Sequence, residues 1–457
     1  MKGLEASSSG VRPPAKKRIL ESPASAEALT HDILLIIFSF LDFLDLLHCS
    51  AVCKSWNWVI STSKLYQSLY YKKKCQSRGV LEESGNLEKL SKMFLKELAL
   101  DSHRASLEEG SVDVYQWKGH STRVNQCRMK MGLVLTGGDD KVMRLWSVNS
   151  YKCLEEYSVP DRARVIDFDF DESKIVSLVG TSVGIWRRHG KKSIFLSRKG
   201  EIPKASCMCY VDPEAVVGCE DGRARFLDMY SRKWSKIVKI QDGPVTCISL
   251  SDSQMIVGGS STGSITVSDL SSAQRVATLK SYGSAGYVLA SDLSSAQRVA
   301  TLKSYDSAGI STLCVNPSSP LIFSGSTAGQ AFCWDLRTMR CLWRTRASPN
   351  VIYSMHHLRD HTSTLVMGGI DGVLRIVDEI SGKVLSGCIL DQNTSGSVST
   401  EASNKLSRKK GRRIAEDTKL DLMPKTSRPS INCLAVGFQK VVTTHDDNYI
   451  RVWKFKI

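Results

Sequence analysis

Short stretches in which apolar and polar residues alternate recur along most of this chain, each followed by a turn of small or acidic residues. From residue 111 onward the stretches close on a large apolar residue, most clearly on Trp146, Trp334 and Trp453. Many closing positions lie about 40 residues apart, a period typical of repeats built from four short strands. Alternation with period two places one face of a strand in a core. The pattern therefore predicts a mainly β repeat domain over 111–457.

Two longer gaps interrupt this period. In the first gap, residues 268–286 return almost unchanged as residues 291–309, and one copy is too short to supply four strands. The first copy directly follows a strand-like segment, so we expect 287–309 to loop out as a duplicated insertion or to displace the first copy. In the second gap, residues 388–428 are rich in Ser, Thr and Lys and poor in aromatics. That composition predicts a disordered basic loop.

Helical spacing replaces the alternation before residue 111. Within 27–71, apolar residues recur every three or four positions in two short runs, and Asp45 stands where it caps the second run. The apolar positions of the first run are Leu29, Ile33, Ile37 and Leu41. Residues 72–110 carry a further apolar helical stripe, which predicts a linker helix. Residues 1–26 are polar and basic, and we expect them to be disordered.

Composition narrows the class of protein. Apolar residues make up 42% and charged residues 24%, the balance of a soluble globular protein. The 14 cysteines lack paired CxxC spacing, which argues against a metal site. The longest apolar stretch, 32–47, is too short and too acidic to cross a membrane. We therefore expect a protein of the nucleus and/or the cytoplasm, with no cofactor and no membrane partner.

The net charge of +16 raises the possibility of nucleic-acid binding. Part of the excess lies in two short runs, 14–18 and 407–413, both in polar surroundings. Such runs serve more often as import signals or solvated segments than as readers of DNA. Nucleic acid is therefore not the expected partner.

The repeats over 111–457 resemble the WD-repeat family. The unit at 119–147 carries four residues that form a hydrogen-bonded chain in that family, namely His120, Thr136, Asp140 and Trp146. The resemblance implies a seven-bladed β-propeller in which 111–119 supplies the outer strand missing from the last blade and closes the ring. A catalytic use of His120 with Asp140 is the alternative, but no nucleophile or metal set accompanies them, so we expect a structural role.

Residues 29–70 resemble the F-box, a small all-α domain. The motifs that match are Asp45–Leu47, Val52–Trp56 and Leu65–Tyr66, whereas Thr30 stands where the family has Pro. Thr is chemically suited to capping the first helix through its hydroxyl. The resemblance implies binding to a Skp-type adaptor, and through it to a cullin–RING complex. The residues expected to bind the adaptor are Leu29, Ile33, Ile37, Phe38, Leu41, Leu46, Leu47 and Trp56.

The combination of both resemblances predicts the substrate-recognition subunit of an SCF-type (Skp–cullin–F-box) ubiquitin ligase. The chain itself would be non-catalytic, with a protein substrate held by the propeller. Two alternatives remain. Residues 334–337 resemble a box through which some WD-repeat proteins dock a different cullin adaptor, with Trp334, Asp335 and Arg337 as its residues. The other alternative is a WD-repeat scaffold outside any ligase.

Overall fold

The computed structural model divides the chain into two compact units, Met1–Ala99 and Leu100–Ile457. The residues it describes are 29–41, 43–66, 68–69, 87–159, 163–190, 192–251, 255–269, 275–279, 289–290, 300–301, 308–315, 319–338, 340–358, 363–391, 406–414 and 428–456. The predicted segment 1–26 lies outside these residues.

The first unit is helical. Its helices are α1 (His31–Ser39), α2 (Phe43–Ser50) and α3 (Lys54–Thr62), followed by α5 (Leu87–Glu108), which ends in the second unit. The third helix contacts both α1 and α2, so the three short helices share one core. No helix among the described residues is both long and apolar enough to span a membrane.

Two details of the predicted helix starts are wrong. Thr30 is the extended N-cap residue of α1, but its side chain makes no capping hydrogen bond, and its carbonyl accepts from the Leu34 amide at 3.0 Å instead. Asp45 lies inside the first turn of α2, because that helix already begins at Phe43. Its carboxylate is thus placed to act on the helix dipole. At the start of α3, Cys53 supplies a capping side chain, because its Sγ accepts from the Trp56 amide.

The second unit consists mainly of β-sheets, and within each sheet most strands pair with the strand before or after them in sequence. Four sheets have four strands each, and the first contains β2 (Val124–Lys130), β3 (Leu133–Gly138), β4 (Val142–Ser147) and β5 (Cys153–Ser158). The second contains β6 (Val165–Phe170), β7 (Lys174–Val179), β8 (Ser182–Arg187) and β9 (Ser193–Leu196), and the third contains β10 (Ala205–Val211), β11 (Glu214–Cys219), β12 (Arg223–Asp228) and β13 (Lys233–Lys239). The fourth contains β20 (Ile310–Val315), β21 (Leu321–Ser326), β22 (Gln330–Asp335) and β23 (Arg340–Arg346).

A further sheet contains the duplicated segment. It runs β14 (Val245–Ser251), β15 (Met255–Ser260), β16 (Ile265–Asp269), β17 (Arg275–Leu279), β19 (Ala300–Thr301) and β18 (Leu289–Ala290). The first copy supplies the outer strand β17, and two residues of the second copy add a short parallel pairing at Thr278↔Thr301. Ser268 and Asp269 of the first copy end β16, and the rest of both copies up to residue 307 lies outside the described residues.

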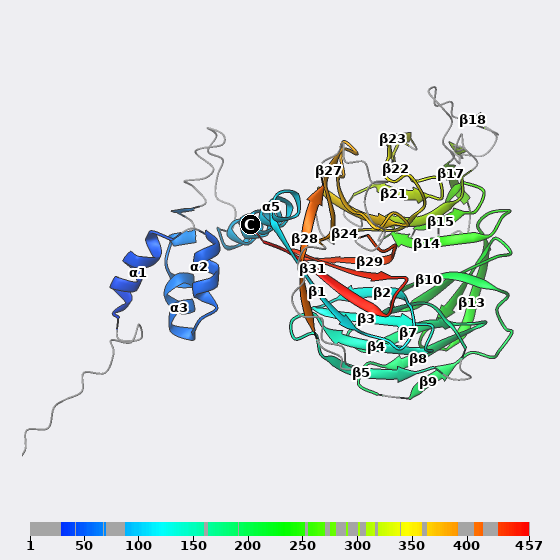
Figure 1. Cartoon of the computed structure of the whole chain (residues 1–457), viewed down its shortest axis with the longest axis horizontal. Helices are drawn as coiled ribbons and strands as arrows, with labels where there is room; N and C mark the ends of the chain where they lie inside the picture. Colours follow the sequence, from blue (N-terminus) through cyan, green and yellow to red (C-terminus); the bar gives the residue numbers. More distant parts are fainter. Residues whose placement is uncertain are drawn as a thin grey trace, which may run out of the picture. The chain divides into compact units, whose positions relative to one another are not determined.

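The last sheet has nine strands. Their order is β24 (Ile352–His357), β25 (Thr364–Gly369), β26 (Leu374–Asp378), β27 (Val384–Leu390), β28 (Ser407–Ile414), β1 (Ser111–Lys118), β31 (Tyr449–Lys456), β30 (Lys440–His445) and β29 (Ile431–Gly437). Strand β1 pairs with β31 along its whole length, from Ser111↔Lys456 to Lys118↔Tyr449. Figure 1 shows this cyan strand beside the red strands of the chain's end. The segment expected to close the ring thus occupies that place.

The innermost strands of these sheets contact one another in the circular order β2, β6, β10, β14, β20, β24, β29 and back to β2. The second unit is therefore a β-propeller of the predicted type, without an open end between its first and last sheets. Because β28 joins two repeat units into one continuous sheet, the sheets are fewer than the units, and the count of seven blades stays a prediction of the sequence period.

The expectation of a disordered loop over 388–428 is wrong where β27 and β28 occupy it. Residues 384–390 form β27, and residues 407–414 form β28 between β27 and β1. A strongly basic strand is stable here because its first half pairs with β1 and its second half with β27, and its charged side chains need no core. Residues 392–405 and 415–427 of the loop lie outside the described residues.

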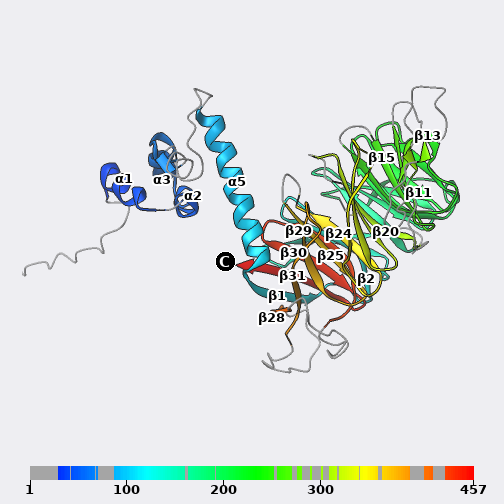
Figure 2. The same ribbon diagram turned by 90° about the horizontal axis from the view of Figure 1, so that it is seen from above.

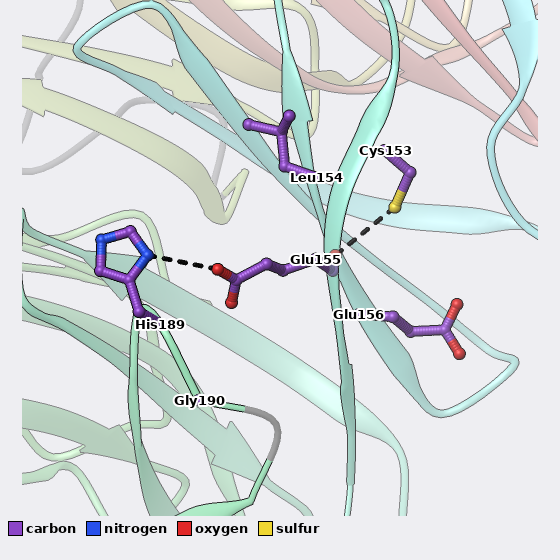
Figure 3. Close-up of a pocket in the computed structure, with 6 residues that line it drawn as sticks. All are labelled: Cys153, Leu154, Glu155, Glu156, His189 and Gly190. Atoms are coloured by element: carbon purple, nitrogen blue, oxygen red, sulfur yellow. Dashed lines mark hydrogen bonds and ion pairs between the residues drawn. The ribbon is translucent and has the colours of Figure 1, made fainter.

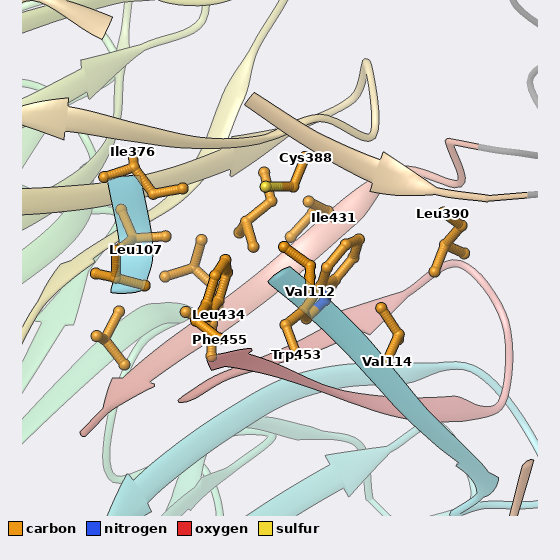
Figure 4. Close-up of a cluster of buried hydrophobic side chains, with 14 residues drawn as sticks. Leu107, Val112, Val114, Ile376, Cys388, Leu390, Ile431, Leu434, Trp453 and Phe455 are labelled. Carbon is orange, nitrogen blue, oxygen red and sulfur yellow. The ribbon is translucent and has the colours of Figure 1, made fainter. Parts of the chain in front are cut away.

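The core of the propeller lies between neighbouring blades, as the apolar alternation predicts. One cluster of buried side chains joins Leu107 of α5 to residues of β1, β27, β29 and β31 (Figure 4). It includes Trp453, Phe455, Val112 and Cys388. The C-terminal end of α5 meets the ring beside β1 and β31 (Figure 2). Since this end is buried against the ring, residues 100–108 belong structurally to the propeller unit.

Candidate functional site

The core of the three short helices is closed by their own side chains. Leu34, Phe38, Leu46, Val59 and Ile60 are buried in it. The rings of Phe38 and Trp56 meet edge to face with centroids 5.3 Å apart. Phe38 and Leu46, which we expected to bind a partner, therefore hold the helices together, because the helical unit has to bury part of its own apolar surface to fold.

The outer side of α1 carries an apolar surface that its own unit leaves uncovered. Ile33, Ile36, Ile37 and Phe40 are all exposed, and Phe40 reaches 84%. Spacings of three, four and seven residues place these four on one side of the helix. We call these four residues the α1 stripe. Leu29, directly before the helix, is also exposed.

The α1 stripe differs from the predicted set in several members. Ile33 and Ile37 belong to both, whereas Ile36 and Phe40 were missed, although their spacing from Ile33 was a signal that could have found them. Leu41 and Trp56 are partly buried against the helical core. The side chain of Leu47 lies outside the described residues. Exposed apolar residues gathered on one helix side are typical of a partner surface.

The first blade, β2–β5, brings its four predicted residues into one chain of hydrogen bonds. His120 Nδ1 lies 2.9 Å from Asp140, His120 Nε2 lies 2.8 Å from Thr136 Oγ1, and Trp146 Nε1 donates to the same hydroxyl at 2.9 Å. Burial disfavours the ionised form of Asp140, but hydrogen bonds from His120 and Arg144 outweigh burial and hold the pKa of this carboxyl well below its usual range. The arrangement satisfies buried polar groups.

The last blade, β29, β30, β31 and β1, contains a similar chain that the sequence pattern did not predict. Trp453 Nε1 donates to Thr443 Oγ1 at 2.9 Å, and His445 Nε2 lies 2.8 Å from that hydroxyl. Its Nδ1 faces the carbonyl of Pro429 at 3.1 Å. Here the histidine follows the threonine by two residues on the same strand, so a search for the Gly-His pair at the start of a blade does not find it.

The box at 334–337 is mostly structural. Trp334 is buried in β22 and donates to Ser324 Oγ at 3.0 Å, and the carboxylate of Asp335 accepts from the Arg337 amide at 2.9 Å. Only the Arg337 side chain, 77% exposed, is open to a partner among these three residues.

The arginines that precede the closing position of several blades pair with the turn aspartates of the same blade. The pairs and their distances are Arg144–Asp140 at 2.8 Å, Arg225–Asp221 at 2.7 Å, Arg375–Asp371 at 2.6 Å and Arg451–Asp447 at 2.6 Å. Arg123 and Arg164 also form ion pairs, with Asp446 and Asp139. These six guanidinium groups thus have carboxylate partners inside the protein.

A surface cleft of about 510 Å³ lies between β5 and the end of β8 (Figure 3). Its lining residues are Cys153, Leu154, Glu155, Glu156, His189 and Gly190. His189 Nδ1 lies 3.3 Å from Glu155, and burial raises the pKa of the Cys153 thiol above its ordinary value. A raised thiol pKa opposes nucleophilic use of Cys153. Among the described residues, no three His, Cys, Asp or Glu side chains gather as metal ligands do.

Comparisons with known proteins match both units. A family model described as F-box-like matches residues 31–72, and the WD domain, G-beta repeat model matches 111–147 and 296–335. An F-box/WD-40 repeat-containing protein of Arabidopsis thaliana is 46% identical over 464 residues, covering 97% of this chain and 97% of that relative. The chain belongs to the F-box/WD-repeat family. The α1 stripe thus lies on the F-box of this family member, and the two histidine chains lie in its WD-repeat propeller.

More distant relatives match only part of this F-box/WD-repeat chain. The F-box/WD repeat-containing protein 2 of Mus musculus is 32% identical over 141 residues, which covers 30% of this chain and 31% of the relative. Among solved structures, the computationally designed protein Ika8 aligns with a TM-score of 0.49 at 15% identity, covering 74% of this chain and 98% of that chain.

Proposed function

We propose that this F-box/WD-repeat protein is the substrate receptor of an SCF-type ubiquitin ligase. In this proposal the F-box binds a Skp-type adaptor, and through it a cullin–RING complex, while the propeller binds a protein substrate. The α1 stripe is the observation that carries the proposal. The helical unit closes its own core with other residues, and the four side chains of the stripe remain together in water on one side of α1. Covering such a surface with a partner releases the water around it and stabilises the complex.

The contribution of this chain to ubiquitin transfer would be proximity. A substrate held on the propeller and a ubiquitin-charged enzyme held through the adaptor belong to one complex, so effective concentration replaces random encounter. In this role the chain needs a rigid ring and an adaptor surface, and no catalytic group of its own. We further propose that it acts in the nucleus and/or the cytoplasm.

Capture of the adaptor tests the proposal on matched variants of one helix. Ile37→Asp and Phe40→Asp place a charge in the α1 stripe. Leu35→Asp is the control, because Leu35 lies on the opposite side of α1 and is exposed to a similar extent, 40% against 43% for Ile37. We expect a Skp-type adaptor to co-purify with the wild type and with Leu35→Asp, and its recovery to fall at least about tenfold with either stripe variant.

Failure of the wild-type chain to capture the adaptor would contradict the proposal. Loss of capture with Leu35→Asp as well would mean that the charge disturbs the helix instead of the interface. The alternative docking box is tested in parallel, because Arg337→Ala removes its exposed side chain and leaves the buried Trp334 in place. Binding of a different cullin adaptor that depends on Arg337 would favour the alternative ligase.

A further inference from the structure

The C-terminal end of α5 is bound by a side chain from a distant part of the sequence. A helix ends with backbone carbonyls that have no partner inside the helix. Arg413, on β28, donates from Nη1 to the Leu107 carbonyl at 2.9 Å and from Nη2 to the Ser106 carbonyl at 3.2 Å. Its Nε and Nη2 also donate to the Gly110 carbonyl, at 3.0 and 2.7 Å. One guanidinium thus caps the end of the helix.

The same guanidinium is fixed on its other side. Arg413 Nη1 donates to Ser386 Oγ on β27, and the guanidinium lies over the ring of Phe455 at 5.9 Å. With this bond Arg413 makes five hydrogen bonds, as many as a guanidinium has N–H donors. A positive charge beside the C-terminal carbonyls also complements the helix dipole.

Strand β28 holds Arg413 in this place through both of its edges. On one edge Cys388↔Arg413 and Gly387↔Ile414 pair with β27, and on the other Asp113↔Lys410 and Tyr115↔Arg408 pair with β1. An ion pair adds to the second edge, because both carboxylate oxygens of Asp113 lie 2.9 Å from Arg408 Nη2. The strand therefore spans the gap between two blades and holds Arg413 at the C-terminal end of α5.

Other contacts of the helix end reach different parts of the ring. His103 Nδ1 accepts from the Gln439 amide at 2.8 Å, and Arg104 Nη1 donates to Ser363 Oγ at 2.6 Å. Leu107 is fully buried among the blade residues (Figure 4). These contacts hold the sides of the helix, whereas Arg413 is bound to the carbonyls at its end, where the chain turns into β1.

We propose that segment 406–414 is a clamp for the linker helix, and that Arg413 is a positioning residue of the receptor that fixes the direction in which α5 leaves the ring. The proposal deepens the ligase function proposed above and rests on it, because a defined helix direction has value in a receptor that brings two bound partners together. The basic run at 407–413 thereby acquires a role within the fold in place of the import signal or solvated segment expected from the sequence.

The test compares Arg413 with its neighbour. Arg413→Gln removes the charge and most of the N–H donors, whereas Arg413→Lys keeps the charge but lacks the planar, multiple-donor geometry of the guanidinium. Arg412→Gln is the control, because Arg412 is exposed on the same strand. Hydrogen exchange of peptide 100–110 is measured in the full-length proteins, together with thermal unfolding of the ring. We expect exchange at Glu109 and Gly110 to rise at least about tenfold in both Arg413 variants, with Arg412→Gln unchanged.

A second readout separates positioning from local stability. The full-length proteins are assembled with a Skp-type adaptor, a cullin–RING complex and a conjugating enzyme, and the chain's own lysines serve as the acceptor of ubiquitin. We expect adaptor capture to stay equal in all variants. We expect the modified lysines to become more numerous in Arg413→Gln, because a helix without a fixed direction presents more of them to the charged enzyme. Arg413→Lys should restore the wild-type set of modified lysines only in part, because it keeps the charge but loses the multiple N–H donors of the guanidinium.

Unchanged exchange of 100–110 in Arg413→Gln would overturn the clamp. Faster exchange with the wild-type set of lysines would overturn the positioning role, since the cap would then stabilise only the helix end. If Arg413→Gln unfolds the ring, Arg413→Lys carries the same readouts. A wild-type chain that captures no adaptor refutes the ligase proposal and with it the positioning role, while the exchange comparison still decides whether Arg413 clamps the helix.

Discussion

The first and last blades satisfy the indole N–H of a buried tryptophan with two different arrangements of threonine and histidine. Both have a buried tryptophan whose indole donates to a threonine ten residues earlier, at 2.9 Å in each case. Both place a histidine Nε2 at 2.8 Å from that hydroxyl. In the first blade, His120 comes from the turn before the blade and is held by Asp140. In the last blade, His445 comes from the same strand as Thr443 and faces a backbone carbonyl.

The difference shows that the structure constrains the hydroxyl more strictly than the histidine. A buried indole N–H needs an acceptor, and a buried hydroxyl between an indole and an imidazole satisfies both. Trp334 meets the need with Ser324 alone. Trp186 has no hydrogen-bond partner for its Nε1 among the described residues. The family's residue set is thus one solution to a need that each blade meets separately.

The largest effect is expected from removing the shared hydroxyl. Thr136→Val and Thr443→Val keep the side-chain shape and leave an indole N–H and an imidazole nitrogen without a partner. Each buried unpaired group costs roughly 1–3 kcal/mol, so both variants should lose about 3 kcal/mol of unfolding free energy in denaturant titrations. A loss confined to Thr136→Val would show that the hydrogen-bonded chain in the last blade does not contribute to the unfolding free energy.

The next effect concerns pH and the histidine of the last blade. Burial lowers the pKa of His445 to about 3 from 6.5, so the unfolded chain binds more protons between these values and stability falls as the pH drops through this window. Linkage predicts a loss of about 2 kcal/mol at pH 5 from this group. His445→Gln should flatten that part of the stability profile when compared with the wild type. An unaltered profile would mean that His445 does not titrate in this window.

A smaller effect is expected at the turn aspartates. Asp140 binds both His120 and Arg144, whereas Asp447 binds Arg451 and a backbone amide. Asp140→Asn should therefore cost about 1 kcal/mol more than Asp447→Asn in thermal or chemical unfolding. Because both carboxyl pKa values lie below the ordinary 3.8, the contribution is present above that pH and is lost as the pH falls below it. Equal losses of unfolding free energy in the two variants would show that the bond from His120 to Asp140 adds nothing to the stability of the first blade.

The smallest effect tests the blade without a histidine. Ser324→Ala removes the one hydroxyl that accepts from Trp334 Nε1. We expect a loss of about 1 kcal/mol, since one indole N–H loses its partner instead of two groups. A loss as large as that of the threonine variants would show that the histidines add little to either chain.

Several features of the fold and the site were predictable because their signals are local. The strand period, the spacing between Thr136 and Trp146 and the helical spacing of Ile33 and Ile37 each lie within one element or one blade. Side-chain direction within a single strand or helix follows from the backbone repeat alone. The mainly β repeat domain therefore follows from the strand period, and the propeller, the F-box and the first hydrogen-bonded chain follow from the family resemblance of the motifs.

Which apolar residues of the F-box are buried and which are exposed was not predictable in the same way. Phe38 and Phe40 are equally apolar and two positions apart, yet Phe38 is buried and Phe40 is 84% exposed. Which side of α1 faces inward depends on where α3 packs, and the sequence of α1 does not specify that choice. The predicted adaptor residues were accordingly a mixture of core and surface.

By itself, the sequence determined the repeat period, the family motifs and the residues that pair within the first blade, because these depend on neighbours along the chain. Only the tertiary structure decided that a basic run becomes β28 and that Arg413 caps a helix some 303 residues earlier. Such contacts form when ring closure brings distant segments together. Their energy depends on which backbone edges and carbonyls remain unpaired at that point, a property of the folded ring and not of any local pattern.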